Sequence, residues 1–184
     1  MYRNPIGQCC RTFCYMPCIE ESLVNRHGNN KSVRVLSWSN GFCECFRWTR
    51  LVTINDRLTS KVWIRKLSGK YAVPLALKTI EALQSIKDLI HTITADNGKE
   101  FAKHQEITEK LEISFYFCTS CHSWERGANE NTNGLIRQYI PKGTDFSGIT
   151  DEFVSWVENK LNNRPRKRLG YLTPNEKFNS ILTN

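Results

Sequence analysis

Two stretches decide the fold: His91-Thr92-Ile93-Thr94-Ala95-Asp96-Asn97-Gly98-Lys99-Glu100-Phe101 and Arg126-Gly127-Ala128-Asn129-Glu130-Asn131-Thr132-Asn133-Gly134-Leu135-Ile136. The first is a short run rich in β-branched residues that ends in a turn signal. It therefore predicts that Asp96 lies at the carboxyl end of a strand. In and just after the second, four residues recur at helical spacing: Asn129, Asn133, Ile136 and Ile140. This spacing predicts that Glu130 lies near the start of a helix.

An acid on a strand end and an acid on a helix can converge on one divalent ion. Residues 97–129, 33 in number, separate Asp96 from Glu130. Mg²⁺ is commonly held by one or two carboxylates together with substrate phosphates, and a pair of such ions about 3.5–4 Å apart serves phosphodiester chemistry. Spacing alone is weak support, because a chain of 184 residues offers many acid pairs. A turn aspartate and a solvated helix glutamate are the alternative interpretation.

The amino-acid sequence of these stretches resembles that of the catalytic core in the insertion sequence thirty family of transposases. The resemblance is carried by Thr94–Phe101, Arg126–Asp145, Asn162–Lys167 and Leu169–Pro174, and it extends from about Arg50 to the C-terminus. The family belongs to the D-D-E transposases and retroviral-type integrases. The resemblance implies an α/β, ribonuclease H-like fold with a mixed β-sheet flanked by helices, bound Mg²⁺ or Mn²⁺, and DNA strand cleavage and transfer as the reaction.

On the family pattern, Asp96 is the second catalytic acid and metal ligand, and Glu130 is the third. The resemblance places the first catalytic aspartate near Ser32 to Asn40, where the sequence has no acid. Loss of this carboxylate is expected to impair the reaction, because a two-metal site then lacks a ligand. Asp56 closes the next strand in the family pattern, so we leave it out of the catalytic set.

Residues 1–48 differ from the rest of the chain in composition. They contain no Asp and no Ala, and they hold six of the eight cysteines. They also show no sustained period of either 3.6 or 2. We predict an irregular, Cys-rich, degraded or frame-shifted segment at 1–48, joined to an integrase-type catalytic core at 49–184.

The charge balance favours a polyanionic partner. The chain has 26 Lys+Arg against 18 Asp+Glu, a net charge of +8 and a pI of about 9.1, which suits DNA; a merely soluble basic surface is the alternative. No apolar run approaches the ~20 residues that span a bilayer, and no secretory signal is recognised. Cysteines in a chain without an export signal indicate reduced thiols. We expect a cytoplasmic, nucleoid-associated protein with no membrane contact.

The core shows ordinary secondary-structure signals. Residues 51–67 predict a hairpin, and a helix is expected to begin at Pro74. Residues 100–111 predict a helix that buries Phe101, Ile107 and Leu111, and residues 113–117 predict a strand. Residues 151–161 predict a helix whose apolar side is Phe153, Val157 and Leu161, and Thr173 to Glu176 is a capping box that starts a last helix.

Beyond the two acids, family position and chemistry assign DNA contacts to six residues. They are Asn97, Asn133, Arg137, Lys142, Arg164 and Arg166. The expected function is that of a transposase catalytic core acting on transposon ends and target DNA. A non-catalytic DNA-binding or dimerising remnant is the alternative, and a general ribonuclease H-type nuclease is a third reading. Assembly as a homo-oligomer stays open.

Overall fold

The computed structural model describes residues 32–38 by their backbone alone. It describes residues 50–69, 71–95, 98–117, 131–141 and 143–183 with their side chains, except the side chains of residues 50 and 147. By Cα proximity the chain divides into Met1–Asn30 and Lys31–Asn184, and every element named below belongs to the second unit.

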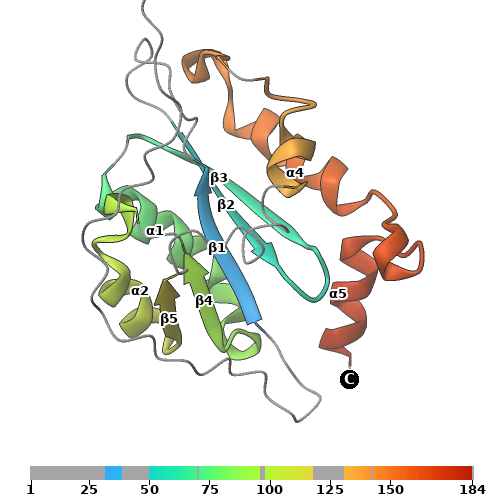
Figure 1. Ribbon diagram of the computed structural model, residues 1–184, viewed down its shortest axis with the longest axis horizontal. Coiled ribbons are helices and arrows are strands. Elements are labelled where there is room, and N and C mark those ends of the chain that lie inside the picture. The colour runs from blue at the N-terminus through green and yellow to red at the C-terminus, as the bar shows by residue number, and fades with distance from the viewer. Residues whose placement is uncertain are drawn as a thin grey trace, which may run out of the picture. The chain divides into compact units, whose positions relative to one another are not determined.

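Five strands form one mixed sheet in the order β3-β2-β1-β4-β5 (Figure 1). They are β1 (Ser32–Trp38), β2 (Arg50–Asp56), β3 (Val62–Leu67), β4 (Thr92–Ala95) and β5 (Ser114–Phe117). β1 pairs antiparallel with β2 and parallel with β4. β2 pairs antiparallel with β3, and β4 pairs parallel with β5. β1 is therefore the central strand, with partners on both sides.

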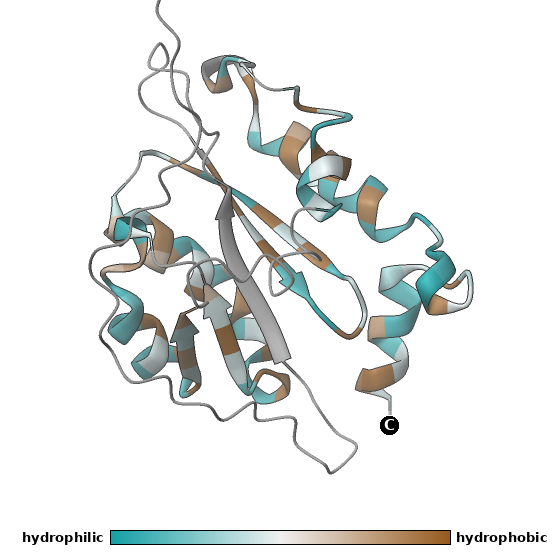
Figure 2. Ribbon diagram, in the orientation of Figure 1, coloured by the Kyte–Doolittle hydropathy of each residue, from teal (hydrophilic) through white to brown (hydrophobic). Residues whose placement is uncertain are grey.

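β2 and β3 form the predicted hairpin, and their side chains alternate between the two faces of the sheet. Val52 and Ile54 pack on one face, whereas Leu51, Val62 and Ile64 pack on the other. Figure 2 shows hydrophobic residues, in brown, along both strands of the hairpin. Two hydrophobic cores result, one on each face.

The first core lies under α1 (Ala72–Leu83), the 3-10 helix η1 (Gln84–Leu89), the 3-10 helix η2 (Lys99–Phe101) and α2 (His104–Leu111). Its members include Phe101, Ile107 and Leu111, which confirms their predicted burial. α1 begins at Ala72, two residues before the predicted start at Pro74. Proline is tolerated within the first turn because the N–H groups there have no helical acceptor.

The second core lies under residues 131–140 and α4 (Asp151–Asn162), with the 3-10 helix η3 (Phe146–Gly148) between them. α4 buries Val154, Val157 and Leu161, whereas Phe153 is 37% exposed. The predicted apolar side was therefore wrong in one member. Phe153 and Val154 are adjacent apolar residues, and the helix is rotated so that Val154 faces the sheet.

The chain ends in the 3-10 helix η4 (Lys167–Leu169) and α5 (Pro174–Leu182). The predicted capping box is confirmed: the Thr173 hydroxyl accepts from the Glu176 amide at 3.2 Å, and a Glu176 carboxylate oxygen accepts from the Thr173 amide at 2.7 Å. Phe178 meets Trp63 edge to face at 5.7 Å between ring centroids, so Trp63 is a packing residue. Within the described residues, no helix is long and apolar enough to cross a membrane.

The predicted arrangement, a mixed sheet flanked by helices, is confirmed. Within the segment predicted to be irregular, residues 1–48, the structure describes residues 32–38, and these form strand β1. β1 lacks a clear sequence pattern, but β2 and β4 supply backbone hydrogen-bond partners on both of its sides. Tertiary pairing of this kind overrides weak local preference.

Candidate active site

The central strand β1 is where the family pattern puts its first acid. Its sequence is Ser-Val-Arg-Val-Leu-Ser-Trp, from Ser32 to Trp38, and it contains neither Asp nor Glu. It precedes β2 and pairs with it along its length, from Val33 opposite Asp56 to Trp38 opposite Leu51. The family position of the first acid therefore falls on a strand, where the sequence predicted an irregular segment, and this strand brings no carboxylate to the centre of the sheet.

The second predicted acid follows the neighbouring strand. β4 ends at Ala95, and the described chain resumes at Gly98, which precedes η2. Asp96 and Asn97 lie between these points, outside the described residues. Their roles as catalytic acid, metal ligand and DNA contact stay predictions.

The face of the sheet near this strand end can be followed through the register. Thr94 pairs with Arg34 of β1, Arg34 pairs with Asn55 of β2, and Asn55 pairs with Val62 of β3. Residues paired across strands share a face, and Val62 belongs to the second core. Thr94 thus lies on the face that residues 131–140 cover, whereas its neighbours on β4 belong to the first core.

The third predicted acid, Glu130, also lies outside the described residues, and the chain directly after it is helical from 131 to 136. Ile136 and Ile140 are fully buried in the second core, so this segment is anchored on the sheet. The side chain of Asn133 is half-buried, and its Oδ1 is shielded from solvent with no hydrogen bond among the described residues. The Arg137 side chain is also half-buried.

No metal site is complete within the described residues. Searched by themselves, they contain no group of three or more His, Cys, Asp or Glu side chains that could hold an ion. Asp56 is unavailable as a substitute, because its carboxylate accepts hydrogen bonds from the Leu58 and Thr59 amides, at 3.1 and 3.0 Å, and from the Thr59 hydroxyl. These contacts close the β2–β3 turn.

Part of the basic segment after α4, residues 164–168, makes contacts within the protein. Arg164 is exposed, and its Nη1 lies 3.3 Å from the Gln138 side-chain oxygen. Arg166 is half-buried and donates to the Leu161 carbonyl oxygen at 3.2 Å. Burial lowers the pKa of Arg166, and the charges of Arg164 and Arg168 act in the same direction. The DNA contacts predicted for Arg164 and Arg166 stay predictions, and Lys142 lies outside the described residues.

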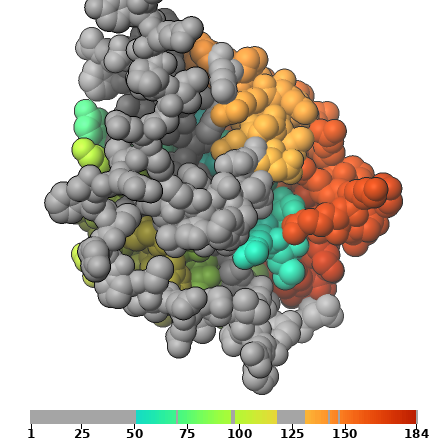
Figure 3. Space-filling model, viewed as in Figure 1, coloured from blue at the N-terminus to red at the C-terminus, as the bar shows by residue number. Residues whose placement is uncertain are grey.

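Arg168, which the sequence did not single out, joins this segment to the β2–β3 turn. Its Nη2 donates to the Arg57 carbonyl oxygen at 2.9 Å and lies 2.5 Å from the Ser60 hydroxyl. In Figure 3 the turn, in turquoise, lies against the red C-terminal region.

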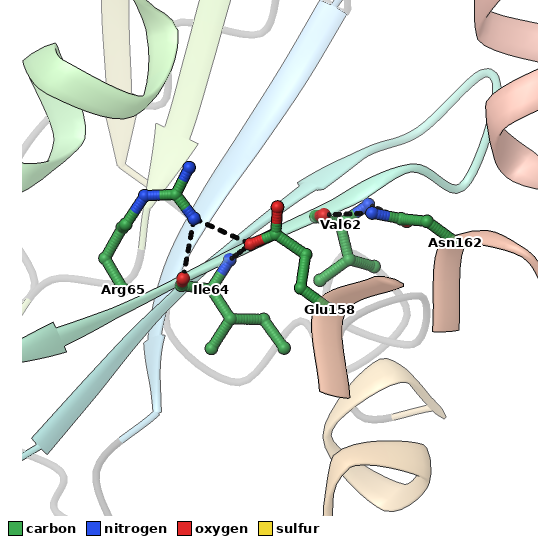
Figure 4. Close-up of polar contacts among 5 residues, drawn as sticks. All are labelled: Val62, Ile64, Arg65, Glu158 and Asn162. Carbon is green, nitrogen blue, oxygen red and sulfur yellow. Dashed lines mark hydrogen bonds and ion pairs between the residues drawn. The ribbon is translucent and has the colours of Figure 1, made fainter. Parts of the chain in front are cut away.

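Two residues of α4 close the free edge of the sheet, and neither was predicted. Asn162 accepts from the Val62 amide at 2.9 Å and donates to the Val62 carbonyl oxygen at 2.7 Å, as a neighbouring strand would. Glu158 accepts from the Ile64 amide at 2.7 Å and pairs with Arg65 at 2.7 Å (Figure 4). The partners are about a hundred residues apart in sequence, so no local signal could have found them.

Comparisons with known proteins fit this arrangement, although no protein-family model matches the chain. The transposase of insertion sequence element IS4351 from Bacteroides fragilis is 74% identical over 132 residues, which cover 72% of this chain and 40% of that protein. The transposase InsI of IS30C from Escherichia coli is 37% identical over 140 residues, or 76% of this chain and 37% of the relative.

Among solved structures, the catalytic core domain of BIV integrase superposes with a TM-score of 0.60 at 18% identity, over 82% of this chain and 96% of that domain. A chain of the simian T-cell lymphotropic virus intasome, in complex with PP2A regulatory subunit B56 gamma, superposes with a TM-score of 0.58 at 19% identity. The match covers 74% of this chain and 50% of that chain.

The fold is therefore that of the integrase catalytic cores, which are ribonuclease H-like. The chain is a homologue of the IS30-family transposases, as its motifs predicted. It spans about 40% of the length of the curated relatives it matches.

Proposed function

We propose that this chain is the catalytic-core part of a transposase, a protein that cleaves DNA strands at transposon ends and joins them to target DNA. The observation that carries the proposal is the central parallel pair β1–β4, with Asp96 as the residue after β4. Ligands of open α/β sheets bind outside the carboxyl ends of their strands. The chain spans about 40% of its relatives, so the activity of the whole protein is part of the proposal.

Asp96 and Glu130 are our candidate ligands for a divalent ion, Mg²⁺ or Mn²⁺. Thr94 lies on the face covered by residues 131–140, and strand alternation carried two positions further predicts the same face for Asp96. Glu130 immediately precedes the helical residues 131–136. Two carboxylates together with DNA phosphates are a ligand set that suits Mg²⁺.

We further propose that strand cleavage is impaired in this chain. β1 is the central strand, and it carries no carboxylate. A two-metal site without one of its ligands holds its ions less well, and neighbouring side chains rarely replace such a ligand. The same observation favours the second candidate function, a non-catalytic DNA-binding or dimerising remnant of a transposase.

DNA binding itself does not depend on the missing acid. The net charge of +8 attracts the phosphate backbone. The proposed contacts are Asn97, Asn133, Arg137, Lys142, Arg164 and Arg166. Of these, Arg164 is exposed at the end of α4, and Asn133 has a shielded Oδ1 that a bound strand could engage.

Assembly and location follow from the same proposal. One structural neighbour is a chain of an intasome, and we propose that this chain also forms a homo-oligomer on DNA. A DNA substrate within the cell places the protein in the cytoplasm, associated with the nucleoid.

A cleavage assay on duplex DNA carrying the transposon end tests the proposal. The full chain is incubated with Mg²⁺ or Mn²⁺ beside the variants Asp96→Asn and Glu130→Gln, and binding to the same duplex is measured in parallel over a range of salt concentrations. Slow nicking that both substitutions abolish supports the impaired enzyme. Salt-sensitive binding without nicking supports the remnant. Preferred cleavage of RNA–DNA hybrids contradicts both and favours a ribonuclease H-type nuclease.

A further inference from the structure

The outward side of α4 carries two exposed aromatic rings, and the half-buried Tyr139 ring contacts one of them. α4 turns Val154, Val157 and Leu161 to the sheet. This leaves Phe153 and Trp156 outside, 37% and 46% exposed. The Phe153 and Trp156 rings stack at 5.7 Å with 24° between their planes, and Tyr139 meets Trp156 edge to face at 5.6 Å. Stacked, exposed rings of this kind offer flat apolar surface that a ligand can cover.

Lys160 borders these rings, and Arg164 lies just beyond the C-terminal end of α4. The Lys160 ammonium lies 5.5 Å from the centroid of the Trp156 ring, and Arg164 contacts Gln138, which directly precedes Tyr139. Tyr139, Phe153, Trp156, Lys160 and Arg164 together are called the aromatic–basic face below.

Three acids of α4 bear on the charge of this face. Glu158 is turned to the opposite side of the helix, where it binds Arg65 and the Ile64 amide. Glu152 lies in the first turn, where its own backbone amide and the Thr150 hydroxyl stabilise its carboxylate and lower its pKa. Asp151 also lies in the first turn, within a cleft of about 470 Å³ between α4, β3 and α1. Lys160 and Arg164 thus carry positive charge toward the C-terminal end of α4, whereas the ionised Glu152, one turn before Trp156, adds a negative charge toward its N-terminal end.

We infer that the aromatic–basic face binds unpaired nucleotides of a DNA strand, with bases stacked on Trp156 and Phe153 and phosphates near Lys160 and Arg164. Single-stranded nucleic acids are bound by this combination of exposed rings and bordering cations, because every base has a π-face. Paired bases in a duplex do not offer that face. The choice of DNA rests on the proposed function, in which cleavage leaves free strand ends.

Fluorescence anisotropy with labelled oligothymidylate and a labelled duplex of equal length tests the inference on the full chain. We expect Trp156→Ala to weaken oligothymidylate binding about tenfold or more while duplex binding changes little. Trp156→Phe keeps a ring and should retain most of the affinity. Lys160→Ala should reduce the slope of the logarithm of oligothymidylate affinity against the logarithm of salt concentration by about one. Tyr71→Ala, which removes a 61% exposed aromatic side chain at the start of α1, is the matched control.

The inference is overturned if Trp156→Ala and Tyr71→Ala bind oligothymidylate equally well. It is also overturned if Trp156→Ala converts a dimer to a monomer in light scattering and leaves oligothymidylate affinity unchanged, which would assign the face to a second copy. Normal duplex binding without oligothymidylate binding contradicts this inference alone. Binding to neither DNA contradicts the proposed function as well. Far-UV circular dichroism on each variant separates lost folding from lost binding.

Discussion

Asn162→Ala is the substitution whose effect the structure defines most closely. The Asn162 carboxamide occupies the place of a missing neighbouring strand along β3, because it accepts from the Val62 amide and donates to the Val62 carbonyl oxygen. β3 is an edge strand, and its outward backbone groups would otherwise lie unpaired. The substitution removes both hydrogen bonds and keeps the helix, since alanine has the highest helix propensity.

The magnitude follows from burial. Val62 is 0% exposed and Asn162 is 3% exposed, so water does not replace the lost partner without entering the core. A buried backbone N–H or C=O left without a partner costs about 1–3 kcal/mol. Two such groups give an expected loss of about 2–6 kcal/mol in the free energy of unfolding.

Urea unfolding followed by circular dichroism measures this loss from the shift in midpoint at constant slope. Asn159→Ala is the matched control, because Asn159 is an exposed residue of the same type on the same helix. It should change stability by less than about 0.5 kcal/mol. Hydrogen exchange adds a local readout: the Val62 amide should exchange faster in Asn162→Ala and at its native rate in Asn159→Ala.

The reasoning is refuted if Asn162→Ala and Asn159→Ala have the same stability and the Val62 amide stays protected in both. That result would mean that other groups satisfy the strand edge. A newly exposed edge also promotes pairing between molecules, so size-exclusion chromatography should show association of Asn162→Ala alone.

Three further predictions concern the rest of the fold. Ile136→Ala should lower the free energy of unfolding by about 2–5 kcal/mol in the same urea experiment, because Ile136 is fully buried between the sheet and α4; a loss below that range would mean the segment after Glu130 is not anchored. Arg168→Ala should lower it by about 0.5–1.5 kcal/mol through loss of its contacts with the β2–β3 turn, and equal effects of Arg168→Ala and Lys167→Ala would contradict that role. Hydrogen bonds from the Thr173 amide, and then from its hydroxyl, lower the pKa of Glu176 from 4.5. This cap should therefore stabilise the protein above pH 4.5, and its contribution should be lost as the pH falls through the lowered pKa. Glu176→Gln should remove that part of the pH dependence of the free energy of unfolding, and identical dependence in the variant and the native chain would refute the prediction.

Local signals predicted much of the fold. The β2–β3 hairpin, the burial of Phe101, Ile107 and Leu111, and the Thr173 capping box depend on residues close together in sequence, and all are present in the structure. Alternation and helical spacing report such neighbours directly.

Contacts distant in sequence were not predictable in the same way. In the sequence, Asn162 is one of several polar residues at the end of a predicted helix. Its contact with Val62, 100 residues away, exists only in the folded chain. β1 has no periodic pattern, and it becomes a strand because β2 and β4 flank it. The choice between Phe153 and Val154 depended on the rotation of α4, which the sheet sets.

The candidate site was predicted through its motifs rather than through geometry. The structure supports the elements that precede Asp96 and follow Glu130, and it supports the absence of an acid on the central strand. The two acids themselves stand as predictions, because they lie outside the described residues.

The central claim is that this integrase-type core lacks one carboxylate on β1 and is otherwise equipped to cut DNA. It is tested most directly by returning the carboxylate. Arg34 pairs with Thr94, on the face covered by residues 131–140, and Leu36 pairs with Thr53 on the same face. Nicking of transposon-end duplex in Mg²⁺ or Mn²⁺ should rise about tenfold or more in Arg34→Asp or Leu36→Asp, and adding Asp96→Asn should abolish the gain. If neither variant nicks faster than the native chain while both bind the duplex normally, the claim is contradicted.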